Sequence, residues 1–154
     1  MRPMSAIVCM LVLYASTARA DVTLERHGSS YNSWGWDSVY VIKSDLVTLA
    51  IVPAIGGRML QYSLGTHGTM WIDPDYLGAT YPSDPRSYLN FGGSRTWLAP
   101  QDRWNWPPPS KALDYGAYTM EIVAQGADSV ALRAISPVEG GANLLTYLID
   151  HGIE

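Results

Sequence analysis

The fold is decided by the stretch Leu46-Val47-Thr48-Leu49-Ala50-Ile51-Val52, in which every residue is apolar or threonine. β-Branched side chains dominate this stretch, and they favour an extended strand over a helix because branching at Cβ restricts χ1. Polar and apolar residues do not alternate, as they do in a strand with one face in water. Pro53 follows directly and ends the segment. The stretch therefore predicts a strand that is buried on both faces of its sheet.

Further strand candidates lie on both sides of this central strand. Val39–Lys43 precedes it across a turn at Ser44-Asp45, Met59–Leu64 follows it, and Thr69–Ile72 begins a fourth strand. The polar segment Asp21–Asp37 is expected to form an irregular lead-in or a short edge strand.

The clearest hairpin pattern lies later in the chain. Ala117–Ala124 and Ser129–Ser136 are two strand-like segments around the turn Gln125-Gly126-Ala127-Asp128. One face of the first segment carries Tyr118, Met120, Ile122 and Ala124. No segment before Pro137 shows a sustained period of 3.6 residues. The sequence thus predicts an all-β domain with antiparallel strands.

A second stretch, Asn90–Pro109, concentrates residues that suit ligand binding. It holds three of the six tryptophans with two arginines interleaved among them, namely Trp97, Trp104, Trp106, Arg95 and Arg103. Gly92-Gly93 allows the backbone to bend or to approach a neighbour closely. Pro100 and Pro107–Pro109 remove amide donors, so the stretch is neither a long helix nor a central strand. An ordered loop with aromatic faces and guanidinium groups indicates a binding surface.

Two motifs carry a family resemblance. They are Ile51-Val52-Pro53-Ala54-Ile55-Gly56-Gly57-Arg58-Met59-Leu60 and Gly92-Gly93-Ser94-Arg95-Thr96-Trp97-Leu98-Ala99-Pro100. Together they resemble a bacterial domain family that is similar to the galactose mutarotase-like, or aldose 1-epimerase-like, supersandwiches. The resemblance spans roughly Tyr40–Pro137. It implies a large antiparallel sandwich of two sheets whose concave face binds carbohydrate, of which this chain is expected to be only the N-terminal part.

The resemblance carries over particular positions but no activity. The matching residues are Arg58, Gly92, Gly93, Arg95 and Trp97, and none of them receives a catalytic role. Aldose 1-epimerases use a histidine acid and a glutamate base. No histidine of this chain lies in a matching motif, and the C-terminal half that would carry the glutamate is expected to be missing.

Arg95 and Trp97 are the best candidates for the centre of a sugar-binding surface. One residue separates them, so in an extended segment they point to the same side. A tryptophan face can stack on the apolar face of a sugar, and a guanidinium can donate paired hydrogen bonds to hydroxyls or a carboxylate. Arg58 and Trp104 are predicted to support this surface. The alternative is structural: an arginine stacked on aromatic rings can pin the loop to the core.

Catalytic residues are only weakly indicated. An epimerase needs an acid and a base in one cleft, for which His67 and Asp102 are the candidates. Glycoside hydrolysis needs two carboxylates, for which the sequence offers only Asp102 with Glu121. His27, His67 and His151 do not share the spacing of metal ligands, and no phosphate-binding or nucleophile-elbow motif is present. No metal or other cofactor is therefore expected.

Residues 1–20 have the pattern of a secretory signal peptide. Arg2 gives a positive start, Ala6–Ala15 is apolar apart from one tyrosine, and Ala18-Arg19-Ala20 matches the small-x-small cleavage pattern. Cleavage after Ala20 starts the mature domain at Asp21 and removes Cys9, the single cysteine of the chain. An N-terminal membrane anchor is the alternative, although the apolar run is short for spanning a bilayer.

The composition fits an exported β-protein and speaks against nucleic-acid binding. The net charge is −4 and there is no basic run. Ten tyrosines and six tryptophans, against one phenylalanine, fit either a wet binding cleft or a β-protein that fills its sheets with aromatic side chains.

Residues 21–154 are therefore expected to form a single periplasmic or secreted domain, incomplete at its C-terminus. Its expected partner is a carbohydrate, which includes anionic sugars, either for binding alone or as part of a carbohydrate-active protein. The alternatives are an aldose epimerase and a structural envelope protein with no ligand. No stable membrane insertion is expected after cleavage, whereas a truncated sandwich is expected to self-associate through its open edge.

Overall fold

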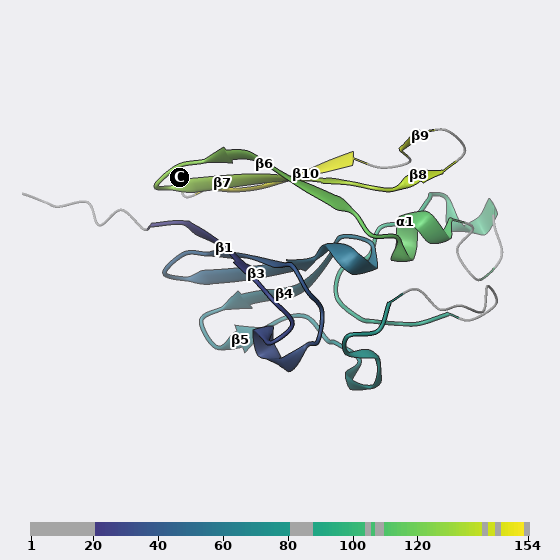
Figure 1. Cartoon of the computed structure of the whole chain (residues 1–154), viewed down its shortest axis with the longest axis horizontal. Coiled ribbons are helices and arrows are strands. Elements are labelled where there is room, and N and C mark those ends of the chain that lie inside the picture. Colours follow the sequence, from purple (N-terminus) through teal and green to yellow (C-terminus); the bar gives the residue numbers. More distant parts are fainter. Residues whose placement is uncertain are drawn as a thin grey trace, which may run out of the picture.

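The computed structural model describes residues 21–80, 88–103, 106, 110–139, 142–143 and 146–152, and this part of the chain is mainly antiparallel sheet (Figure 1). The predicted all-β class with antiparallel strands in two sheets is confirmed. The proposed signal peptide at residues 1–20 lies outside the described residues. No helix in the described ranges is long and apolar enough to cross a membrane.

The larger sheet has five strands in the order β1-β2-β3-β4-β5, so each strand pairs with its neighbour in the sequence. Its strands are β1 (Thr23–His27), β2 (Val39–Lys43), β3 (Val47–Val52), β4 (Arg58–Leu64) and β5 (His67–Gly68). Short 3₁₀ turns join or follow them: η1 (Tyr31–Ser33), η2 (Pro53–Ile55) and η3 (Pro74–Tyr76). The register of β3 against β4 shifts between Ala50 and Ile51, which marks a β-bulge.

The smaller sheet has three strands in the order β10-β7-β6 and lies over the larger sheet as a second layer (Figure 1). Its members are β6 (Thr119–Gln125), β7 (Ser129–Ile135) and β10 (Thr146–Gly152). A two-stranded ribbon, β8 (Val138–Glu139) and β9 (Ala142–Asn143), follows β7, while η4 (Gln101–Arg103) and the one α-helix of the described residues, α1 (Lys111–Tyr115), precede β6. The predicted hairpin is confirmed. Across its turn, the backbone N–H of Gly126 donates to the Ser129 carbonyl at 2.8 Å.

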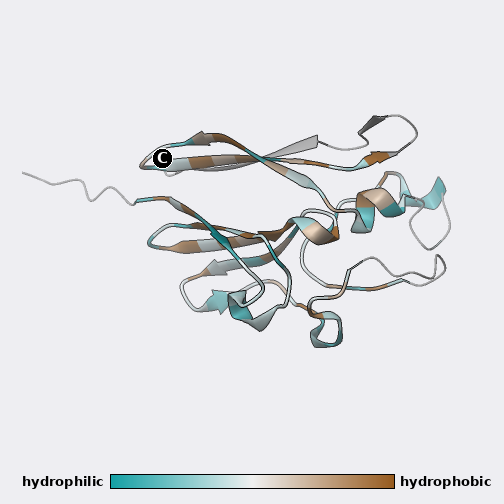
Figure 2. Ribbon diagram, in the orientation of Figure 1, coloured by the Kyte–Doolittle hydropathy of each residue, from teal (hydrophilic) through white to brown (hydrophobic). Residues whose placement is uncertain are grey.

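The central strand β3 is buried on both faces, as its sequence predicts. Leu49 and Ile51 belong to the core between the two sheets, where they meet Val130 and Leu132 of β7. Ala50 and Val52 face the opposite side, in a second core that the loops cover. Figure 2 shows that hydrophobic segments concentrate on the strands of both layers. Burial on two faces explains why the alternation of a one-sided strand is missing from β3.

The loop-covered core is built mainly from aromatic side chains. Trp34, Trp36 and Phe91 are buried there, although all three come from segments outside the strands. The Trp36 indole N–H donates to the Ala79 carbonyl at 2.6 Å and so fixes one loop upon another. These loops therefore form a third layer that packs on the free face of the larger sheet.

Two segments differ from the prediction. The lead-in contains a regular edge strand, β1, so the second of the two expectations for Asp21–Asp37 is confirmed. A fourth strand at Thr69–Ile72 is wrong: β5 lies earlier, at His67–Gly68, and Ile72 makes only an isolated bridge to Gly92. The chain turns away after Ile72 because Asp73 caps η3, whose first residue is Pro74.

The edge of the smaller sheet exposes apolar side chains. β6 pairs with β7 on one side and is an edge strand on the other. Ile122 and Val123 are exposed, and so is every other residue of β6 except Met120. An exposed edge strand with apolar side chains can pair with another chain, which is the physical basis of the expected self-association.

Candidate functional site

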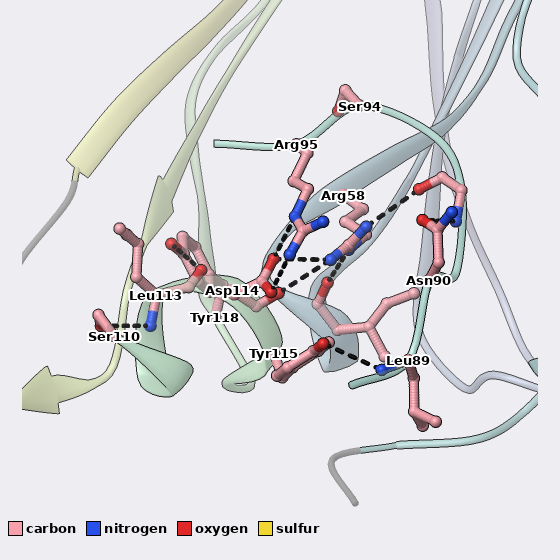
Figure 3. Close-up of polar contacts among 12 residues, drawn as sticks. Arg58, Leu89, Asn90, Ser94, Arg95, Ser110, Leu113, Asp114, Tyr115 and Tyr118 are labelled. Carbon is pink, nitrogen blue, oxygen red and sulfur yellow. Dashed lines mark hydrogen bonds and ion pairs between the residues drawn. The ribbon is translucent and has the colours of Figure 1, made fainter. Parts of the chain in front are cut away.

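A buried aspartate between two arginines is the centre of the candidate site (Figure 3). Arg58 donates from Nη2 to Asp114 Oδ1 at 2.8 Å. Arg95 donates from Nε to Oδ1 at 2.9 Å and from Nη2 to Oδ2 at 2.5 Å. The Asp114 carboxylate is thus shared by two guanidinium groups, which leaves this cluster with a net charge of +1 when all three groups are ionised. We call it the Arg58–Asp114–Arg95 cluster.

Asp114 reaches this position through the short helix α1. Ser110 caps the helix, because its hydroxyl accepts from the Leu113 N–H at 3.1 Å. Gly56, at the corner before β4, has φ +80°, and a Cβ there would lie 2.2 Å from the Asp114 carbonyl oxygen. Only glycine permits this approach of the corner to α1. The corner and the helix are further joined by the Gly56 N–H, which donates to the Gly116 carbonyl at 2.9 Å.

Arg58 is committed to the protein interior. It is buried, and Nε donates to the Ile55 carbonyl while Nη1 donates to the Gly92 carbonyl, both at 3.1 Å. Burial lowers the pKa of Arg58 from its ordinary value, while the Asp114 carboxylate opposes that change. Arginine nevertheless stays charged in proteins near neutral pH. Arg58 therefore positions Asp114 and, through it, Arg95; it does not face a ligand.

Arg95 lies closer to solvent and is surrounded by aromatic rings. Its side chain is 17% exposed. Its Cζ atom lies 4.6 Å from the ring centres of Tyr88 and Trp97 and 5.6 Å from that of Trp106. Within the described ranges, no residue accepts a hydrogen bond from Arg95 Nη1. Asp114 thus fixes one edge of the guanidinium, and Nη1 keeps capacity to donate to another group.

The rings around Arg95 contact one another and form a partly open frame. Trp106 lies edge-on to Tyr88 at 4.4 Å and edge-on to Trp97 at 6.1 Å, measured between ring centres. Trp97 is half-buried, whereas Trp106 is 53% exposed. We call the group Tyr88, Arg95, Trp97 and Trp106 the Arg95 aromatic surface. It presents a cation and flat apolar faces together.

The structure brings together some of the residues that the sequence indicates. Arg95 and Trp97 lie on the same side, as their spacing predicts, and Arg58 lies beneath them. Trp104, the fourth predicted binding residue, lies outside the described residues. The close approach expected at Gly92-Gly93 is present, since a Cβ on Gly92 would lie 2.2 Å from the Trp71 carbonyl oxygen.

The weak catalytic candidates are exposed and come from different elements. His67 is exposed on β5, and Asp102 is exposed in η4. Glu121 forms an exposed ion pair with Arg133 at 3.2 Å across the β6–β7 hairpin. Among the described residues, no three histidine, cysteine or carboxylate side chains form a group that could hold a metal ion. The arrangement around Arg95 suits the binding of a polar or anionic group better than proton transfer, because Asp114 is buried and already accepts three hydrogen bonds.

Asp114 and Tyr88 are the site residues that the sequence reasoning missed. Asp114 is one of many aspartates in the chain, and nothing in its spacing to Arg58 or Arg95 marks it. The available signal was local: Ser110 follows a proline run and stands where a helix N-cap is expected before Lys-Ala-Leu-Asp-Tyr. A capped helical turn at this point would have set Asp114 apart from the surrounding loop.

Tyr115 next to the cluster gives the site a testable dependence on alkaline pH. Burial raises the pKa of Tyr115 from 10.0 to about 12, and the charge of Asp114 adds to this effect. The folded protein holds the phenol proton more tightly than the unfolded chain. Its contribution to stability is therefore complete below about pH 10 and is lost as the pH rises through about 12.

We expect Tyr115→Phe to lose less stability than the parent protein between pH 10 and pH 12. The measurement is the free energy of unfolding in urea at several pH values. At neutral pH the variant should start lower, because the Tyr115 hydroxyl accepts from the Leu89 N–H at 3.0 Å. The remaining tyrosines are common to both proteins, so equal losses would show that Tyr115 has no such role.

Comparison of the chain with protein-family models found no matching model, and comparisons with curated proteins and with solved structures likewise found no match.

Proposed function

We propose that this protein is an exported carbohydrate-interacting domain that binds glycan at the Arg95 aromatic surface. The observation that carries the proposal is the state of Arg95. Its guanidinium is held by a buried carboxylate and surrounded by three aromatic rings, and among the described residues no group accepts a hydrogen bond from its Nη1. The resemblance to the mutarotase-like sandwiches points to the same class of ligand.

The surface has the two chemical features that sugar recognition uses. Trp106, which is 53% exposed, offers a flat face for the apolar side of a sugar ring, and the half-buried Trp97 lies beside it. Arg95 offers donors to hydroxyl or carboxylate oxygens, and the net positive charge of the cluster favours an acidic sugar such as a uronate. Because Asp114 fixes the guanidinium in advance, binding costs less side-chain entropy than it would with a free arginine.

A glycan panel with neutral and acidic sugars, followed by calorimetric titration of variants, tests the proposal. Arg95→Lys is expected to weaken uronate binding by about 1–3 kcal/mol, because lysine cannot reproduce the planar donor edge of arginine. Trp97→Ala removes a stacking face and is expected to weaken neutral and acidic sugars alike. Trp71→Ala is the matched control, since Trp71 is also exposed and is not one of the rings around Arg95.

The competing interpretation is that this surface only packs the loop onto the sandwich. It is favoured by the paired hydrogen bonds from Arg95 to the buried Asp114. Circular dichroism separates the two interpretations. If both variants remain folded and bind like the parent protein, the glycan site lies elsewhere. If both variants unfold, Arg95 and Trp97 serve packing, and the binding proposal fails.

A further inference from the structure

A cavity lined in part by η2 shares no residue with the Arg95 aromatic surface. Its volume is about 320 Å³, at the lower end of the range for small-molecule pockets. It lies between the two edge strands, β1 of the larger sheet and β6 of the smaller one. Its lining is formed by Arg26, Asp37, Ser38, Tyr40, Pro53, Ala54, Ala117, Tyr118 and Met120.

The inner wall of this cavity is apolar and fixed. Tyr118 lines the cavity and is buried, and its hydroxyl donates to the Leu113 carbonyl at 2.9 Å, which fixes the side chain. The Tyr118 N–H donates to the Pro53 carbonyl at 2.9 Å, which joins the residue before β6 to η2. Met120 packs against the core between the sheets and leaves part of its side chain on the wall. Such a wall suits a small aliphatic or aromatic group.

The mouth carries one positive and one negative side chain. Arg26 donates from Nη2 to the Ser38 hydroxyl at 2.6 Å, and its Cζ atom lies 5.6 Å from the Tyr40 ring centre. Ser38 has φ +61°, a left-handed conformation that is strained for a serine and is often found at functional sites. Asp37 precedes it directly and also lines the cavity.

The two opposite charges do not neutralise each other. Throughout the described part of the chain, neither Arg26 nor Asp37 forms an ion pair. Arg26 therefore keeps donors for an anionic group, and Asp37 keeps acceptors for a cationic group. A ligand that carries both charges close together, with an apolar body, complements this mouth and this wall.

We propose that the cavity binds a free α-amino acid with a medium-sized apolar side chain. Arg26 holds the carboxylate, Asp37 accepts from the ammonium group, and the side chain lies against Tyr118 and Met120. A neutral sugar carries neither charge, so it would leave Arg26 and Asp37 without counter-charges in the complex. This site is independent of the proposed glycan surface.

Titration of the purified protein with L-leucine, followed by calorimetry and by ¹H–¹⁵N spectra, tests the proposal. Two analogues separate the charges: leucinamide lacks the carboxylate, and 4-methylpentanoate lacks the ammonium group. We expect saturable binding of leucine, at least tenfold weaker binding of each analogue, and shifts of the amide signals of Ser38 and Met120. Glucose serves as the sugar probe and is expected not to bind here.

Variants at the mouth then assign the two roles. Arg26→Gln is expected to weaken leucine at least tenfold. Asp37→Asn is expected to weaken leucine but not 4-methylpentanoate, which has no ammonium group. Both side chains are exposed, so the fold should persist, and Arg133→Gln is the matched control because Arg133 lies in an exposed ion pair elsewhere. Arg95→Lys should leave leucine binding unchanged, which separates this site from the glycan surface.

Three outcomes overturn the proposal. Phenylalanine and methionine are titrated in the same way as leucine. Failure of all three amino acids to give saturable shifts excludes an amino-acid site. Equal affinity of leucine and 4-methylpentanoate excludes the role of Asp37. Unchanged leucine affinity in Arg26→Gln excludes the role of Arg26.

Discussion

Asp114→Asn is expected to destabilise the protein by about 3–5 kcal/mol, the cost typical of breaking a buried ion pair by removing one partner. The substitution leaves the buried guanidinium of Arg58 without its counter-charge. It also weakens the hold on Arg95, which donates to both carboxylate oxygens. The asparagine keeps the shape of the side chain, so the effect reports charge and hydrogen bonding, with little change in volume.

The measurement is the free energy of unfolding in urea, followed by circular dichroism and tryptophan fluorescence. Glu121→Gln is the matched control, because it breaks an exposed carboxylate–arginine pair that should be worth at most about 1 kcal/mol. Arg58→Met in the Asp114→Asn background should recover part of the loss, since it removes the uncompensated buried charge. A loss no larger for Asp114→Asn than for Glu121→Gln would mean that the cluster does not stabilise the fold.

Phe91→Ala is expected to cost about 3–5 kcal/mol, the range for truncating a buried aromatic side chain. Phe91 is fully buried in the loop-covered core. Its ring centre lies 6.0 Å from that of Trp36, 6.1 Å from that of Tyr76 and 5.9 Å from that of Tyr115. The variant leaves a cavity among these rings and removes the aromatic face under Arg58.

Thermal and urea unfolding of Phe91→Ala give this loss directly. Leu46→Ala is the control, because Leu46 is 67% exposed and should change stability by no more than about 0.5 kcal/mol. Phe91→Leu should recover part of the stability by refilling the cavity. A Phe91→Ala variant as stable as the Leu46→Ala variant would show that the loop layer is not part of the cooperative core.

The strands could be predicted because their signals are local. The β-branched run at β3 and the alternation in the β6–β7 hairpin are properties of neighbouring residues, and both segments form the expected strands. The failure at Thr69–Ile72 has the opposite cause. Thr69–Ile72 has strand-like residues, but its pairing depends on a distant segment. Gly92 approaches closely and forms a single isolated bridge with Ile72.

In the candidate site, too, local spacing could be predicted from the sequence, whereas contacts between distant segments could not. The proximity of Arg95 and Trp97 follows from their spacing of two residues, and the structure confirms it. Their carboxylate partner could not be predicted, because Asp114 is 19 residues from Arg95 and 56 residues from Arg58. The Ser110 cap marks the helical turn that carries Asp114, but the contact of that turn with Arg58 and Arg95 depends on the close packing of Gly56 against α1, which is a tertiary feature.

The same long separations affect the order of folding. The hairpins of the larger sheet join adjacent segments and can close early, whereas the Arg58–Asp114–Arg95 cluster requires three distant segments to have docked. Interactions that form after the transition state slow unfolding without accelerating folding. The described part of the chain contains no cysteine, so no disulfide can prolong its folded lifetime. The ion pairs of the shared carboxylate are therefore expected to slow unfolding more than they accelerate folding.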